Sequence, residues 1–270
     1  MISMVAKTYY HKRIWELDFF RGLAIIMMVF DHLMFDFAFF DTFFSNFRQV
    51  DNSIINWLYE IANLYWDSLL RFIGREFFLL LFLIISGISF TFSKNNFIRG
   101  LKLLLVAILI TVVTYLVENL LGVRVLIVFG VIHMFAFSIL IAAIIRKFIK
   151  NEIIILFIGM LVLTFGFIFG MFSSSYVPLT WANLPKIIIG LNRYGADHFG
   201  IVPYVGFILI GTVIGNTFYK NRVSLLPQFN ISKNNIFATA GRNTLLIYVL
   251  HQPLVLVFVT ILAYILGYRF

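Results

Sequence analysis

Apolar residues in this chain come in long runs that are separated by short polar breaks. The runs lie at 17–40, 74–92, 100–120, 125–145, 152–172, 200–219 and 243–267. A run of about twenty residues spans the roughly 30 Å hydrocarbon core of a bilayer as a helix. Transmembrane strands would instead alternate over about ten residues. The pattern therefore predicts an all-α polytopic membrane helix bundle with about seven transmembrane helices.

Two gaps between the runs are long enough to hold structure of their own. The gap at 41–73 is amphipathic and rich in Trp and Tyr, so we expect a short helix on the membrane surface. The gap at 173–199 contains an apolar patch and is expected to be a re-entrant or surface segment. Because no internal repeat or low-complexity tail is evident, residues 1–270 are predicted to form a single domain.

Composition supports a lipid environment. The chain is 61% hydrophobic and 12% charged, with a mean hydropathy of +0.98, and a soluble domain needs more charge to cover its surface. The basic residues lie between the runs rather than in a stripe that could grip phosphate backbones, so no nucleic-acid partner is expected. The absence of cysteine excludes disulfides, thiol catalysis and cysteine-ligated metals. The first run is too long for a signal-peptide core and is expected to be a retained helix.

The net charge of +9 is unevenly divided between the connections. With seven spans, two acidic residues, Glu16 and Glu152, fall on the N-terminal side against thirteen basic ones. These are Lys7, Lys12, Arg13, Lys94, Arg99, Lys102, Arg146, Lys147, Lys150, Lys220, Arg222, Lys233 and Arg242. The other side carries seven acidic residues and seven basic ones, namely Arg48, Arg71, Arg75, Arg124, Lys186, Arg193 and Arg269. The positive-inside rule then places the N-terminus in the cytoplasm and the C-terminus outside.

The first run carries ionisable residues at membrane depth, namely Asp18, Arg21, Asp31, His32 and Asp36. Such groups cost several kcal/mol and are candidates for a functional site. All except Asp31 fall on one side of a helix and form a polar stripe. Asp18 and Arg21 are spaced to pair, and His32 could act as a base that Asp36 orients. The alternative is that the stripe only holds this helix against its neighbours.

Two further histidines lie in predicted spans, His133 after Gly130 and His251 before Gln252 and Pro253. Each either forms an interhelical hydrogen bond or shares a site with His32. His198 is expected at the surface. No metal is expected, because the chain has no histidine pair four residues apart and no HExxH motif.

Small residues mark places where helices could approach closely, at 86–89 and at 206–215. The sequence Gly241-Arg242-Asn243-Thr244 opens the last run. It is interpreted either as an anion-binding helix N-terminus or as a simple N-cap with a topology-setting charge.

Five motifs occur in a familiar order. They are Arg13-Ile-Trp-Glu-Leu-Asp18-Phe-Phe-Arg21-Gly22, Phe78 to Gly87 with Arg99-Gly100, Val128 to His133, Pro203 to Gly206 with Gly211, and Gly241 to Tyr248. Over nearly the whole chain, these motifs resemble the heparan-α-glucosaminide N-acetyltransferase catalytic-domain family. The small prokaryotic members also tend to carry the pair His32 and Asp36, His133 after a glycine, and His251-Gln252-Pro253.

The resemblance implies a multi-pass acetyltransferase of the cell membrane. It would take acetyl from cytosolic acetyl-CoA and deliver it to an amino sugar or another glycan, lipid or amine-bearing acceptor outside. In the animal lysosomal relative, the catalytic histidine corresponds to about Asp41 of this chain. Acetyl transfer from acetyl-CoA suggests two roles for the polar residues. The candidate catalytic residues are His32, Asp36, His133 and His251, and the candidates for binding acetyl-CoA are Asp18, Arg21, Arg99 and Arg242.

Several alternatives remain open at this point. His32 is taken as the base, with His133 or His251 as a hydrogen-bond donor or acceptor-site residue, and transfer is either direct or through an acetyl-histidine. Rival functions are a small proton-coupled transporter, an O-acyltransferase of the cell envelope and a non-catalytic membrane scaffold. A homodimer is compatible with all of these functions.

Overall fold

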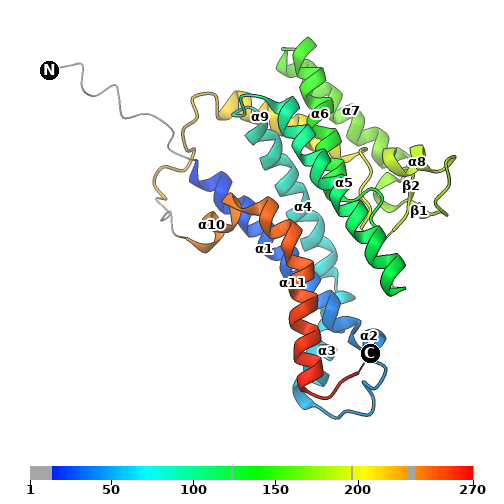
Figure 1. Cartoon of the computed structure of the whole chain (residues 1–270). Coiled ribbons are helices and arrows are strands. Elements are labelled where there is room, and N and C mark those ends of the chain that lie inside the picture. The colour runs from blue at the N-terminus through cyan, green and yellow to red at the C-terminus, as the bar shows by residue number, and fades with distance from the viewer. Residues whose placement is uncertain (1–13, 123, 196, 230–234, 270) are drawn as a thin grey trace. The chain divides into compact units, whose positions relative to one another are not determined.

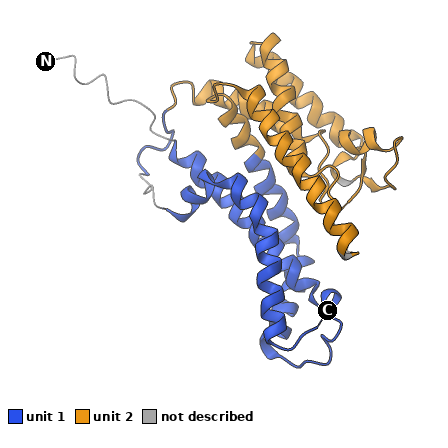
Figure 2. Cartoon of the chain, viewed as in Figure 1, with its two compact units in different colours: residues 1–82, 223–270 blue, residues 83–222 orange. Residues whose placement is uncertain are grey.

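The computed structural model describes residues 14–122, 124–195, 197–229 and 235–269. The chain divides into two compact units, one formed by residues 1–82 and 223–270 and the other by residues 83–222 (Figure 2). Four of the basic residues assigned above to the cytoplasmic side, Lys7, Lys12, Arg13 and Lys233, lie outside the described residues.

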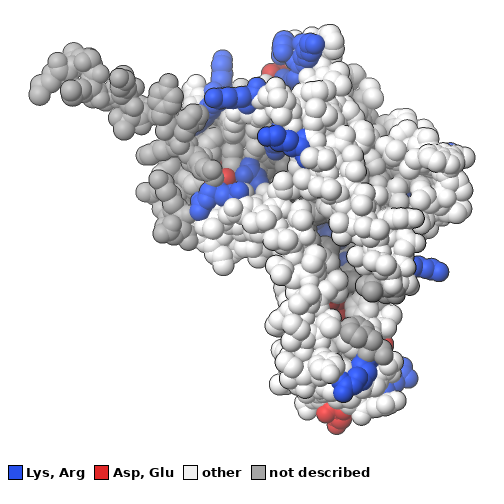
Figure 3. All heavy atoms as spheres, in the orientation of Figure 1, with Lys and Arg blue, Asp and Glu red and all other residues white. Residues whose placement is uncertain are grey.

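Every predicted span corresponds to a helix (Figure 1). These helices are α1 (Trp15–Ala38), α4 (Leu69–Phe90), α5 (Asn96–Leu121), α6 (Val131–Phe148), α7 (Glu152–Ile168), α9 (Tyr204–Phe218) and α11 (Thr244–Ile265). In the described part of the chain, α4, α5, α6 and α11 are long and apolar enough to cross a membrane, whereas α7 and α9 are apolar but shorter. The protein is therefore a multi-pass, α-helical membrane protein. On the face drawn in Figure 3, most of the surface is uncharged, as contact with lipid requires.

The two long gaps contain the remaining elements. The first gap holds α2 (Phe40–Phe43) and α3 (Ser53–Trp66), so the expected helix is present. The second gap holds the 3₁₀ turn η1 (Met171–Ser173), the strands β1 (Ser175–Tyr176) and β2 (Asn192–Arg193), and helix α8 (Leu184–Ile189). The two strands pair in parallel, a small addition that the all-α prediction lacked.

In the first unit, α1 packs against α3, α11 and the short helix α10 (Ile236–Arg242). The approach of α1 to α10 depends on two glycines: a Cβ on Gly22 would collide with the Phe237 carbonyl oxygen, and one on Gly241 with the Asp18 carbonyl oxygen. Gly241 therefore serves helix packing. Beyond the end of α1, a largely aromatic core forms around Phe40, which is fully buried.

In the second unit, α5 packs on α6, and α6 and α7 both pack on α9. Glycines permit the close contacts of α9, as the small-residue clusters predict. A Cβ on Gly87 of α4 would collide with the Ile208 carbonyl oxygen and lie 2.8 Å from the Cα of Gly211. A Cβ on Gly206 would lie 2.8 Å from the carbonyl oxygen of Gly159 in α7.

Helix α4 offers a direct test of this packing. We expect Gly87→Ala to destabilise the protein by roughly 1–3 kcal/mol, because overpacking forces the backbones apart. Gly74→Ala is the matched control on the same helix, since nothing lies within 4 Å of a Cβ placed there. Melting temperatures in detergent should fall only for Gly87→Ala; equal melting of the two variants would contradict the close contact.

Candidate functional site

The polar stripe of α1 faces α10 and α11, whereas Asp31 faces α3 and the start of α4. Arg21 contacts α10, and His32 and Asp36 contact α11. Asp31 instead bonds to Tyr65 of α3 and Arg71 of α4. Asp31 lies on a different side of α1 from the polar stripe, as helical periodicity predicts, and therefore has different neighbours.

His32 and His251 meet where α1 packs on α11. Their ring centroids are 4.7 Å apart and the rings are nearly perpendicular, at 85°. The Nδ1 of His32 lies 2.9 Å from the Met28 carbonyl oxygen, and the Nδ1 of His251 lies 2.6 Å from the Tyr248 carbonyl oxygen. A carbonyl can only accept, so each Nδ1 is the protonated donor. In both neutral rings, Nε2 is then the basic nitrogen.

Asp36 lies one helical turn beyond His32 and is fully buried. Its two carboxylate oxygens accept from the side-chain amide of Gln252, at 3.1 and 3.3 Å. Among the described residues, the Gln252 Oε1 atom is buried without a hydrogen bond. Asp36 therefore contacts Gln252, and the carbonyl of Met28 holds the His32 ring. The orienting role of Asp36 stays a prediction.

The other end of α1 is held by a second set of polar contacts. Arg21 donates to Asp18 Oδ1 at 3.2 Å and to the Gly241 carbonyl oxygen at 3.3 Å, so the spaced pair does form. The buried Glu16 carboxylate accepts from Ser224 Oγ and Leu225 N, both at 2.8 Å. These contacts fasten the segment that precedes α10 to the beginning of α1.

Asp31 forms a cluster that the sequence reasoning did not anticipate, because it assigned Arg71 to the outer connection. Arg71 donates to both Asp31 oxygens, at 2.9 and 3.3 Å, and its guanidinium stacks 3.3 Å from the Trp66 ring centroid. Tyr65 donates to Asp31 as well. Burial, together with the charge of Asp31, raises the pKa of Tyr65 to about 12, so its hydroxyl stays protonated. The cluster joins α1, α3 and α4.

His133 lies in the second unit and uses both ring nitrogens for hydrogen bonds. Its Nδ1 accepts from the Gly130 N–H at 3.3 Å, so in the neutral ring Nε2 carries the proton. Nε2 lies 3.1 Å from Thr111 Oγ1, whose hydroxyl donates to the Ile127 carbonyl oxygen. His133 therefore caps the beginning of α6 and ties it to α5.

The remaining candidates are spread over both units. Arg242 is half-buried in α10 and donates to Thr239 Oγ1 at 2.8 Å. Arg99 lies in the first turn of α5, in the second unit. His198 is half-buried rather than at the surface, and its Nε2 donates to the Ile187 carbonyl oxygen at 2.9 Å. Burial lowers the pKa of His198, which favours the neutral ring.

The predicted site thus assembles in part. Four polar side chains of the first unit come together between α1 and α11, namely His32, Asp36, His251 and Gln252. Gln252 was not among the predicted residues, although it stands beside His251 in the motif. Within the described ranges, no three His, Cys, Asp or Glu side chains form a group that could hold a metal ion.

Comparison with known proteins identifies the family. Residues 13–253 match the family described as heparan-alpha-glucosaminide N-acetyltransferase, catalytic. No curated protein and no solved structure matches the chain. The matched region runs from the start of the Arg21 motif to Pro253, and so contains all four residues of the α1–α11 cluster. The chain belongs to the heparan-α-glucosaminide N-acetyltransferase catalytic-domain family, and is thereby a membrane acetyltransferase-like protein.

Proposed function

We propose that this protein transfers acetyl from cytosolic acetyl-CoA to an amino sugar, or to another glycan or lipid acceptor, at the outer face of the cell membrane. The observation that carries the proposal is the pair of imidazoles between α1 and α11, with the buried carboxylate of Asp36 one turn away. Family membership supports acetyl chemistry and acetyl-CoA as the donor. The acceptor class follows from the name of the family alone.

His32 is proposed as the general base. Because Met28 fixes Nδ1 as a donor, the lone pair of the neutral ring resides on Nε2. That nitrogen takes the proton of an acceptor amine or hydroxyl as the acceptor attacks the thioester carbonyl. A C–N or C–O bond forms, the C–S bond breaks, and the CoA thiolate leaves and takes up a proton.

His251 is proposed to assist at the reacting carbonyl. Its imidazole lies against His32 and is held by Tyr248 in the same tautomer. Once protonated, its Nε2–H can donate to the oxyanion that develops as the acceptor attacks. A nucleophilic route through acetyl-histidine uses the same Nε2 lone pair.

Arg21 is proposed to bind the phosphates of acetyl-CoA, with Arg242 and Asp18 of the same unit as supporting residues. The guanidinium of Arg21 has donors in a planar fork suited to phosphate oxygens. Its bonds to Asp18 and the Gly241 carbonyl fix its direction. The excess of basic residues on the predicted cytoplasmic side would attract a polyanionic donor to this end of α1.

Replacing the base tests the proposal. We expect His32→Ala to lower kcat/KM for acetyl transfer at least a hundredfold, the usual contribution of a general base, and His251→Ala to lower it by a smaller factor. His198→Gln is the control, because it removes a histidine outside the cluster and its amide can still donate to Ile187. Release of CoA from acetyl-CoA in detergent, with glucosamine as the acceptor, gives the rates.

Three results are decisive. Full activity of His32→Ala would remove the base assignment. Release of no CoA by the wild-type protein with any amine, sugar or lipid acceptor would contradict the acetyltransferase itself. Acetylated protein that accumulates in acetyl-CoA alone, and is lost in His32→Ala or His251→Ala, would establish the acetyl-histidine route over direct transfer.

His133 should behave differently from the histidine pair. We expect His133→Leu to lower stability by about 1–3 kcal/mol, because the Gly130 N–H loses its partner in a buried position, while turnover per folded molecule stays near the wild-type value. Thermal melting and CoA release are measured on the same preparation. Loss of turnover with unchanged melting would instead place His133 in the reaction.

A further inference from the structure

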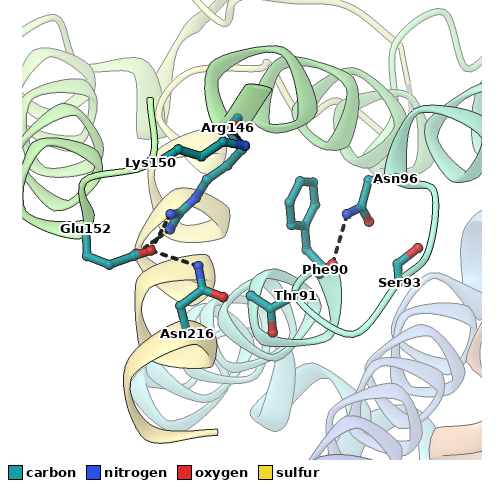
Figure 4. A pocket seen from close by; sticks show the side chains of 8 residues that line it. All are labelled: Phe90, Thr91, Ser93, Asn96, Arg146, Lys150, Glu152 and Asn216. Carbon is teal, nitrogen blue, oxygen red and sulfur yellow. Dashed lines mark hydrogen bonds and ion pairs between the residues drawn. The ribbon is translucent and has the colours of Figure 1, made fainter. Parts of the chain in front are cut away.

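A basic hollow lies in the second unit and shares no residue with the α1–α11 cluster. It consists of two adjoining cavities of about 360 and 270 Å³ that share four lining residues, Phe90, Asn96, Arg146 and Lys150. The first cavity also contains Glu152 and Asn216 (Figure 4), and the second contains Lys94 and Lys147. The hollow is formed by the ends of α4 and α6, the beginnings of α5 and α7, and the last turn of α9.

The charge inside the basic hollow is only partly compensated. Arg146 donates to both oxygens of Glu152 at 2.7 Å and to Thr212 Oγ1, and Asn216 donates to Glu152 at 2.8 Å (Figure 4). Glu152 is the one carboxylate among the lining residues, and these hydrogen bonds occupy both of its oxygens. In the part of the chain that the structure describes, Lys94, Lys147 and Lys150 form no ion pair. Four cations against one carboxylate leave a net charge of +3 that an anion can offset.

A second observation points to a ligand with a hydrogen-bond donor. Asn96 donates from Nδ2 to the Phe90 carbonyl oxygen at 2.9 Å, which leaves its Oδ1 as an acceptor. This Oδ1 is buried and, among the described residues, accepts no hydrogen bond. A buried acceptor without a partner costs about 1–3 kcal/mol. A ligand hydroxyl would satisfy Asn96 Oδ1.

The basic hollow has an apolar rim, by which we mean the exposed apolar side chains of α5 and α6 at and near its lining residues Phe97 and Lys147 along each helix. Phe97 and Leu101 of α5 are 50% and 45% exposed, and Ile144 and Phe148 of α6 are 51% and 76% exposed. These side chains belong to two helices that are long and apolar enough to span a membrane. Acyl chains would cover them, while the lysines stand at the helix ends, where phospholipid headgroups lie.

We propose that the basic hollow binds the phosphate of an anionic phospholipid whose headgroup carries a hydroxyl, of the phosphatidylglycerol type. Lys94, Lys147 and Lys150 hold the phosphate, Asn96 Oδ1 accepts from the headgroup hydroxyl, and the acyl chains lie along α5 and α6. Soluble phosphates such as those of coenzyme A share this chemistry but have no acyl chains to cover the rim. None of the residues that line the hollow is among those proposed for acetyl transfer.

The test measures lipid binding by the full-length protein in a neutral detergent, with native mass spectrometry as the readout. Phosphatidylglycerol is titrated against phosphatidylcholine for the wild type and for the double variant Lys94→Gln/Lys147→Gln. Each lysine near an anionic headgroup contributes about fivefold, so the double variant should bind phosphatidylglycerol roughly 25-fold more weakly. The matched control is Lys186→Gln/Lys220→Gln, which removes the same charge from exposed positions outside the hollow.

The outcomes separate the alternatives. Preferred binding of phosphatidylglycerol by the wild type and the control, lost in the Lys94/Lys147 variant with unchanged melting, supports the lipid site. Equal binding by all three proteins would overturn it. Displacement of the lipid by inorganic phosphate or coenzyme A would overturn the lipid assignment in favour of a soluble phosphate. Because CoA release is measured separately, in detergent without phosphatidylglycerol, failure of the lipid experiment leaves the acetyltransferase proposal intact.

Discussion

The arrangement of the first unit depends on one constraint: the ionisable side chains of α1 are buried or half-buried, so they need hydrogen-bonding partners from the protein. Each such group has a different hydrogen-bond partner. Arg21 forms hydrogen bonds with Asp18 and a carbonyl of α10. Asp31 accepts from Arg71, and Asp36 accepts from Gln252 of α11. Most of these partners belong to other helices, so forming the hydrogen bonds of α1 fixes the positions of its neighbours.

The same constraint explains why packing and chemistry share residues. Gly22 and Gly241 let α10 approach α1 closely, which brings the Gly241 carbonyl within reach of Arg21. Farther along, the contact of His32 with His251 packs α1 on α11. The carbonyls that hold both rings come from the preceding turn of the same helix, so tautomer and orientation are defined before any substrate binds. The polar stripe thus holds the helices together and presents two basic nitrogens.

How far the sequence could predict this depends on the range of each interaction. Hydropathy located a helix for each of the seven runs, because apolar run length is a property of the local sequence. Among the described residues, four of these helices are long and apolar enough to cross a membrane and two are apolar but shorter. Helical periodicity separated Asp31 from the stripe, but the partner of Asp31, Arg71, lies 40 residues away, and only the fold shows that α3 and α4 return to α1. Likewise, the link from His133 to α5 requires the position of Thr111, which no local pattern contains.

Charge balance along α1 bears on the proposed mechanism. Asp18 with Arg21, and Asp31 with Arg71, are neutral ion pairs, which an apolar environment tolerates far better than single charges. Asp36 has only the neutral amide of Gln252 among the partners described above. A base that takes a proton one turn away becomes an imidazolium, and the charges of His32 and Asp36 then offset each other. In the proposed mechanism, proton transfer to His32 would therefore place a positive charge one turn from the Asp36 carboxylate and form a third pair of opposite charges. Such pairing lowers the cost of general-base catalysis in a site that is partly shielded from water.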